Sequence, residues 1–190
     1  MVVLRRVPVL ALVALSLAAA LLTPGRAGAA EPAADLESEV KAAFLYNFAK
    51  FVEWPPEALP AAPVTFCVYR EDPVGASLEA LTRGETLNGR RLVVRRLRDF
   101  LQVRECHVLF LNAAEKGHLP EALSALHGAG VLTVGEGKDF LDKGGMIRLF
   151  LEQNRMRFDI NLDAAETCAL KISSKLLRLA HAVNPQRGEG

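Results

Sequence analysis

The first hydrophobic pattern after residue 30 has the period of a helix. Over residues 40–54, apolar side chains recur at steps of three and four, which predicts an amphipathic helix with one face on a core. The positions are Val40, Ala43, Phe44, Phe48, Phe51 and Val52. Because a proline disfavours the helical conformation of the residue before it, Trp54 followed by Pro55 predicts the end of this helix.

Short apolar runs then alternate with helical segments. The predicted strands cover residues 64–69, 92–97, 106–111 and 131–134, and the first reads as buried on both faces. Helices are predicted from an Asp72 N-cap over 74–81, ending at Gly84, and over about 119–127, before Gly128. Strands that alternate with helices predict a mainly parallel sheet with crossover helices.

After residue 145 the pattern changes to a hairpin, with arms at 146–152 and 155–161 and a turn at Gln153-Asn154. In the second arm the apolar positions Met156, Phe158 and Ile160 alternate with the polar positions Arg155, Arg157, Asp159 and Asn161. This alternation predicts a half-buried strand whose polar row faces away from the core. Asp163 and Ser173 are predicted caps of two short helices, the second reaching about Val183. We therefore predict a single-domain α/β fold with a mainly parallel sheet, crossover helices and a C-terminal antiparallel hairpin.

The N-terminal segment has the composition of an export signal. Arg5 and Arg6 precede the uncharged apolar run 7–22, and Ala27-Gly28-Ala29 supplies small residues for cleavage. The run is short for a membrane span, which needs about 20 residues. We predict a signal peptide over 1–29, a linker over 30–39, a folded domain over 40–184, a frayed tail over 185–190, and a periplasmic location.

Charge limits the classes of partner. Removal of residues 1–29 takes away three arginines and no acidic residue, which leaves 161 residues with 20 basic and 22 acidic side chains, a net charge of −2. This charge favours neither nucleic acid nor anionic lipid as a partner. Without a second apolar span, we expect the mature form not to be embedded in a membrane.

Catalytic motifs are not evident. Gly135-Glu-Gly-Lys138 lacks the spacing of phosphate and dinucleotide loops, so we interpret it as a plain turn after a strand. The four histidines show no metal-ligand spacing, and Ser173, Ser174 and Lys175 are contiguous rather than spaced as a Ser-x-x-Lys pair. We expect no enzyme activity, cofactor or metal.

Cys67 and Cys106 lie in the first and third predicted parallel strands. Such strands are commonly neighbours in a doubly wound sheet, which can bring the two Cα atoms within disulfide distance. We expect a Cys67–Cys106 disulfide in an oxidising compartment, and two buried free thiols are the alternative. Cys168 is expected to be a buried free thiol among alanines.

Three blocks of the chain resemble the YfiR family of small periplasmic regulators. They are the helix 40–55, the block from Val131-Leu-Thr-Val-Gly135 to Gly144-Gly-Met-Ile147, and the tail from Arg157-Phe-Asp-Ile-Asn161 to Lys171-Ile-Ser-Ser-Lys-Leu-Leu177. The resemblance implies a homodimer that represses the periplasmic sensor part of a membrane diguanylate cyclase or another sensor. It also implies an outer-membrane lipoprotein as a second partner, an output in cyclic-di-GMP and biofilm behaviour, and the Cys67–Cys106 bridge. Leu141 and Arg148 stand where some members have a second bridge, so that bridge is not expected here.

Two functional hypotheses remain open. The first is a repressor whose partner binds the row Arg155, Arg157, Asp159 and Asn161, although a solvated outer face is the alternative interpretation of that row. The second is a periplasmic small-molecule-binding protein that feeds a membrane sensor, with its ligand at the carboxyl ends of the parallel strands.

Overall fold

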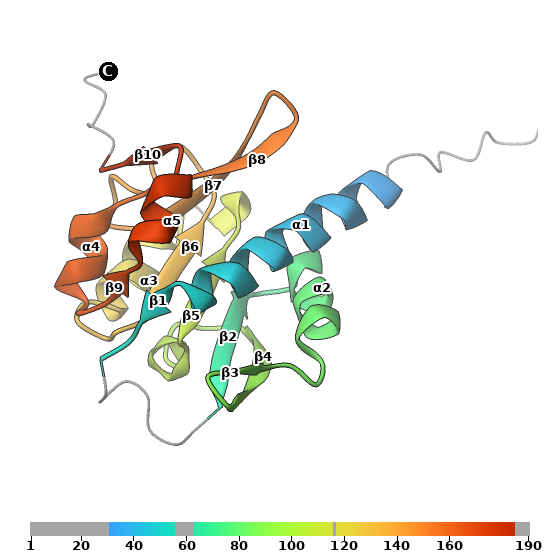
Figure 1. Cartoon of the computed structure of the whole chain (residues 1–190), viewed down its shortest axis with the longest axis horizontal. Coiled ribbons are helices and arrows are strands. Elements are labelled where there is room, and N and C mark those ends of the chain that lie inside the picture. Colours follow the sequence, from blue (N-terminus) through green and yellow to red (C-terminus); the bar gives the residue numbers. More distant parts are fainter. Residues whose placement is uncertain (1–30, 56–62, 116, 185–190) are drawn as a thin grey trace, which may run out of the picture.

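The computed structural model describes residues 31–55, 63–115 and 117–184 (Figure 1). The predicted signal peptide and the predicted C-terminal tail lie outside the described residues. In the part of the chain that is described, no helix combines the length and the apolar character needed to cross a membrane.

An eight-stranded sheet forms the centre of the domain, in the order β10-β8-β7-β6-β5-β2-β4-β3. Its strands are β2 (Val64–Tyr69), β3 (Thr86–Leu87), β4 (Arg90–Leu97), β5 (Val108–Leu111), β6 (Leu132–Gly135), β7 (Ile147–Glu152), β8 (Arg155–Ile160) and β10 (Ala182–Val183). Strands β4, β2, β5, β6 and β7 run parallel, and β8 returns antiparallel to β7. The predicted α/β class, with a mainly parallel sheet and an antiparallel hairpin, is confirmed.

Helices cover both faces of this sheet. The helices are α1 (Glu31–Lys50), α2 (Pro73–Thr82), α3 (Leu119–Ala125), α4 (Leu162–Thr167) and α5 (Ser174–Leu179). Residues of α1, α2, α4 and α5 share one apolar cluster with the sheet. Residues of α3 belong to a second cluster, which also contains Cys67, Cys106 and Phe140. The sheet is therefore buried between two apolar layers, which explains why β2 is buried at every position.

The first helix differs from its prediction at both ends. It begins at Glu31, so residues 31–39 are helical rather than a linker. It ends at Lys50 rather than Trp54, because Val52 and Glu53 form β1 and pair with β9 (Lys171–Ile172). This pairing draws the chain out of the helix before Trp54 and Pro55 are reached. The core-facing side of α1 includes the predicted Phe48.

Helix caps decide the other segment ends. Asp72 caps α2 as predicted, since its Oδ1 accepts a hydrogen bond from the Val74 N–H at 2.9 Å. Ser173 caps α5 as predicted, but that helix ends at Leu179, and residues 182–183 form β10 beside β8. The prediction for α4 was wrong, because Asn161 rather than Asp163 is its N-cap.

Candidate partner-binding surface

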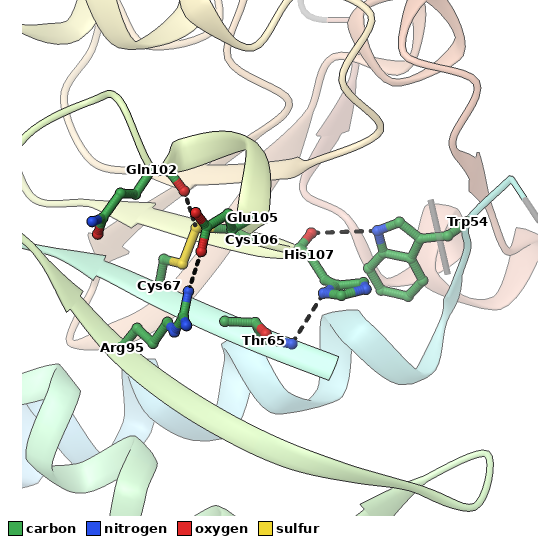
Figure 2. Close-up of a disulfide and its surroundings, with 8 residues drawn as sticks. All are labelled: Trp54, Thr65, Cys67, Arg95, Gln102, Glu105, Cys106 and His107. Carbon is green, nitrogen blue, oxygen red and sulfur yellow. Dashed lines mark hydrogen bonds and ion pairs between the residues drawn. A yellow bond between two sulfur atoms is a disulfide. The ribbon is translucent and has the colours of Figure 1, made fainter. Parts of the chain in front are cut away.

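The predicted disulfide is present. Cys67 in β2 and Cys106, two residues before β5, have Cα atoms 5.8 Å apart, and their sulfur atoms are bonded (Figure 2). They can meet because β2 and β5 are adjacent parallel strands. Cys168 is free and buried, as expected.

Polar contacts on either side of the bridge join further segments to it (Figure 2). Glu105 pairs with Arg95 of β4. His107 accepts a hydrogen bond at Nδ1 from the Thr65 N–H, at 3.0 Å, and its carbonyl accepts one from Trp54 Nε1, at 3.3 Å. His107 is buried, and the bridge together with these contacts links β2, β4 and the segment that leads into β5.

The hairpin of β7 and β8 extends beyond the rest of the sheet at the top of Figure 1. Its turn residues Gln153 and Asn154 have φ values of 50° and 59°, the left-handed conformation that a tight two-residue hairpin turn needs. Near this end, Arg155 is exposed, and Arg157 is half-buried with its Nε 2.8 Å from Glu152 Oε2 of β7. These two members of the predicted row lie on the outer surface.

Asp159, the third member of the row, is buried, with only 2% of the residue exposed. Its Oδ2 lies 2.5 Å from Arg148 Nη2, and its Oδ1 lies 2.9 Å from His181 Nδ1. The expectation that Asp159 lies on a solvated face was wrong, because the side chains of Arg148 and His181 hold its carboxylate there.

Asn161, the fourth member, is half-buried and has structural partners at both ends of its amide. Its Oδ1 accepts a hydrogen bond from the Ala164 N–H at 3.0 Å, and its Nδ2 donates one to the Leu141 carbonyl at 3.2 Å. Asp163, the expected cap, instead accepts a bond from Asn184 Nδ2. Asn161 therefore does not belong to an outer surface shared with Arg155 and Arg157.

A groove of about 390 Å³ lies beside the exposed end of β8. Its lining residues come from α1, β8, the last residue of α5 and the segment that joins α5 to β10: Phe44, Arg155, Met156, Arg157, Phe158, Leu179, Ala180 and His181. Leu179 is 68% exposed, an unusual fraction for a large apolar side chain. We call this set the β8 groove, and it is the candidate partner-binding surface.

The carboxyl ends of the parallel strands, where a ligand cleft was expected, are joined by polar contacts. Asn112, which follows β5, donates a hydrogen bond to Asp72 at 2.7 Å. Glu136, which follows β6, lies 2.6 Å from Lys41 Nζ of α1. Burial lowers the pKa of Lys41, but its hydrogen bonds to Glu136 and Glu37 outweigh this effect, so its pKa is raised from 10.5. The Lys41–Glu136 pair thus holds α1 at the carboxyl end of β6.

A larger cavity, of about 450 Å³, opens elsewhere. It lies between α3 and α4, and its walls include Leu126 and His127 from before β6 and Gly144 and Met146 from before β7. The cavity is therefore beside the amino ends of these strands, on the side opposite to the expected cleft.

Sequence reasoning missed two residues that line the candidate surface, His181 and Phe44, and also Arg148, which holds Asp159 next to it. Arg148 had a detectable signal, because in a hairpin with a two-residue turn at Gln153-Asn154 it must lie opposite Asp159. His181 and Phe44 had none, since only the folded chain brings α1 and the end of α5 to β8.

Solved structures share the fold at low sequence identity. A crystal structure of a conserved domain protein from Vibrio cholerae O1 biovar El Tor is 13% identical, with a TM-score of 0.51, over 77% of this chain and 60% of its own. The ABC domain from Streptococcus pneumoniae in complex with L-Trp is 10% identical, with a TM-score of 0.53, over 75% of this chain and 60% of its own. The chain thus spans 60% of the length of each, and these likenesses show the fold alone. No curated protein sequence matches the chain significantly.

A family model matches far more specifically. The model of DUF4154, described as YfiR/HmsC-like, aligns with residues 38–181. The match includes α1 from its third turn, both cysteines of the disulfide, the hairpin and α5. It therefore spans all of the sheet except β10, and it includes residues of both apolar layers and the β8 groove. On this evidence, the chain belongs to the YfiR/HmsC-like family.

Proposed function

We propose that the protein is a periplasmic regulator that binds and represses the periplasmic sensor region of an inner-membrane diguanylate cyclase, and so lowers cyclic-di-GMP signalling. The observation that carries the proposal is the family match over residues 38–181, since this family is regulatory rather than catalytic. An exposed apolar groove bordered by charge supports a binding role, because such surfaces mark protein interaction sites.

Within the predicted row, the four residues have different roles in this proposal. Arg155 and Arg157 contact the sensor directly, because they lie on the outer surface at the end of the hairpin. Asp159 and Asn161 position the strand, because Asp159 is buried between Arg148 and His181 and Asn161 caps α4. An outer-membrane lipoprotein that competes for the same surface, and a homodimeric state, complete the proposed arrangement.

The repressor role is tested in cells that carry the protein and a diguanylate cyclase with a periplasmic domain encoded beside it. Deletion of the protein should raise the cyclic-di-GMP concentration, and expression of the wild-type chain should return it to its original level. The Arg155→Glu variant should leave the cyclic-di-GMP concentration raised. The Arg91→Glu variant, an equal charge reversal at an exposed position of β4, should lower it as the wild-type chain does. Normal cyclic-di-GMP after deletion would contradict the repressor role.

Location and assembly have their own tests. Mass spectrometry of periplasmic protein should find an N-terminus near Ala30, and an intact Met1 on membrane-bound protein would contradict export by cleavage.

Sedimentation of the mature domain should give twice the monomer mass at micromolar concentration, and a monomer at that concentration would contradict the proposed homodimer.

The second candidate function is a small-molecule binder that feeds a membrane sensor, and the cavity between α3 and α4 favours it. Its walls are mostly apolar, with Lys143 and His127 among the polar lining residues, the composition typical of small-ligand sites. Native mass spectrometry of protein purified from the periplasm should then detect a bound small molecule. Ala164→Phe, which fills the cavity, should abolish that adduct, and an adduct that persists would place the ligand elsewhere.

A further inference from the structure

The outer edge of β8 is paired over only part of its length. β8 pairs with β7 at all six residues but with β10 only at Asp159 and Ile160. The carbonyls of Phe158 and Ile160 accept hydrogen bonds from this side, at 2.8 and 2.6 Å. Because backbone groups alternate along a strand, the N–H and C=O of Met156 point to the same edge. None of the described residues forms a hydrogen bond with these two Met156 groups at this edge.

The β8 groove runs along this open stretch. Phe158 packs edge-on against Phe44 of α1, with ring centroids 5.9 Å apart, and Met156 lies two positions further along the same face of the strand. Leu179 and Ala180 also line the groove. An added strand would therefore have an apolar surface below it for alternate side chains, which is how strand addition gains specificity.

Charge on the groove favours an acidic occupant over a second copy of this chain. Arg155 and Arg157 flank Met156 in sequence and line the groove, and Glu152 offsets part of the charge of Arg157. If two copies paired through this edge, the arginines of one would face those of the other, and like charges opposite each other destabilise a sheet. A segment with carboxylates would instead be attracted.

We propose that the outer edge of β8 binds an extended segment of the partner, in which apolar and acidic side chains alternate. The segment forms main-chain hydrogen bonds with Met156, and its apolar side chains enter the groove over Phe44 and Phe158. Its carboxylates lie against Arg155. About four residues span the open stretch at about 3.3 Å per residue. The inference rests on the proposed function, because it describes how the partner in that function is held.

A pair of synthetic peptides tests this edge without the partner. An acetylated Glu-Val-Glu-Val-Glu peptide should shift the Met156 amide signal in NMR spectra and slow its hydrogen exchange by about tenfold at saturation. The matching Lys-Val-Lys-Val-Lys peptide should not. An unmoved Met156 amide, or equal effects of both peptides, would overturn the inference. A Met156 shift that depends on protein concentration without peptide would also overturn it, because a second copy would then fill the edge.

Proline substitutions separate the edge from the rest of the hairpin. Met156→Pro removes only an N–H that points outward, so the ladder with β7 stays intact, and peptide affinity should fall by about tenfold. The matched control is Leu151→Pro, at the residue opposite Met156 in the hairpin, whose N–H points to the other edge. It should change affinity less than twofold, and equal losses would overturn the inference. Peptide binding that persists while the cyclase domain fails to bind would contradict the proposed function alone.

Discussion

Asp159 and His181 are joined by a hydrogen bond of 2.9 Å between Oδ1 and Nδ1, although 22 residues separate them in the chain. The same carboxylate holds Arg148 with its other oxygen. Arg148 in turn lies over the Phe150 ring, 4.6 Å from its centroid, and His181 meets that ring edge-on. One buried carboxylate thus ties β7, β8 and the residue before β10 together next to the candidate binding surface.

We expect Asp159→Ala to destabilise the protein by about 3 kcal/mol, because removal of one partner leaves the buried part of Arg148 uncompensated. Urea denaturation followed by circular dichroism measures this change. Arg155→Ala, at an exposed position of the same strand, is the control and should change the free energy of unfolding by less than about 0.5 kcal/mol. Equal stabilities of the two variants would contradict the structural role of Asp159.

Replacement of Cys67 and Cys106 by serine should destabilise the protein by about 4 kcal/mol, since the bridge closes a sequence separation of 39 residues in the unfolded chain. The melting temperature should fall, and a reductant should no longer affect it. In a Cys168→Ala control, the response to reductant should match that of the wild type, because this thiol is free. A wild-type melting temperature that does not respond to complete reduction would refute the structural role of the bridge.

Lys41 should stabilise the fold in a pH-dependent way. Burial alone would lower the pKa of Lys41, but Glu136 and Glu37 raise it overall above 10.5, so the native state holds this proton more tightly than the unfolded chain. The stabilisation is therefore complete below pH 10.5 and is lost as the pH rises through the folded-state pKa. Denaturation midpoints measured from pH 8 to 11.5 should show that the wild type is more stable than Lys41→Met, and that this difference in stability shrinks above pH 10.5.

The exposed Lys171→Met variant controls for the loss of one positive charge. At neutral pH, the loss of stability in Lys171→Met should be smaller than the loss in Lys41→Met. If the Lys41→Met difference did not change between pH 8 and 11.5, the ion pairs with Glu37 and Glu136 would not be its source.

Gly145→Ala should destabilise the domain by about 1–3 kcal/mol through overpacking. A methyl group at Gly145 would lie 2.2 Å from Cε1 of the buried Phe140 ring, and one at Gly135 would lie 2.2 Å from Cε2. Thermal unfolding measures the cost, which should be smaller in a Phe140→Leu background because the smaller side chain leaves room. Gly117→Ala, in open space, is the control. Additive effects of Gly145→Ala and Phe140→Leu would contradict direct contact.

Local sequence patterns were sufficient to predict structural features that depend on a single segment of the chain. The unbroken apolar run of β2 predicted a strand buried on both faces, and Asp72 before Pro73 predicted the start of α2. Both depend on interactions within a few residues. The neighbouring positions of Cys67 and Cys106 also followed, because the alternation of strands and helices restricts the order of strands.

The sequence by itself determined the class of the sheet, the register of its hairpin and the family, since these depend on periodicity and on short recurring blocks. Only the tertiary structure decided that Asp159 is buried while Arg155 and Arg157 remain outside. Alternation along a strand tells which side chains share a face, but not what packs against it. Here Arg148 of β7 and His181 from the segment before β10 hold the Asp159 carboxylate on that face, whereas Arg155 near the turn stays exposed.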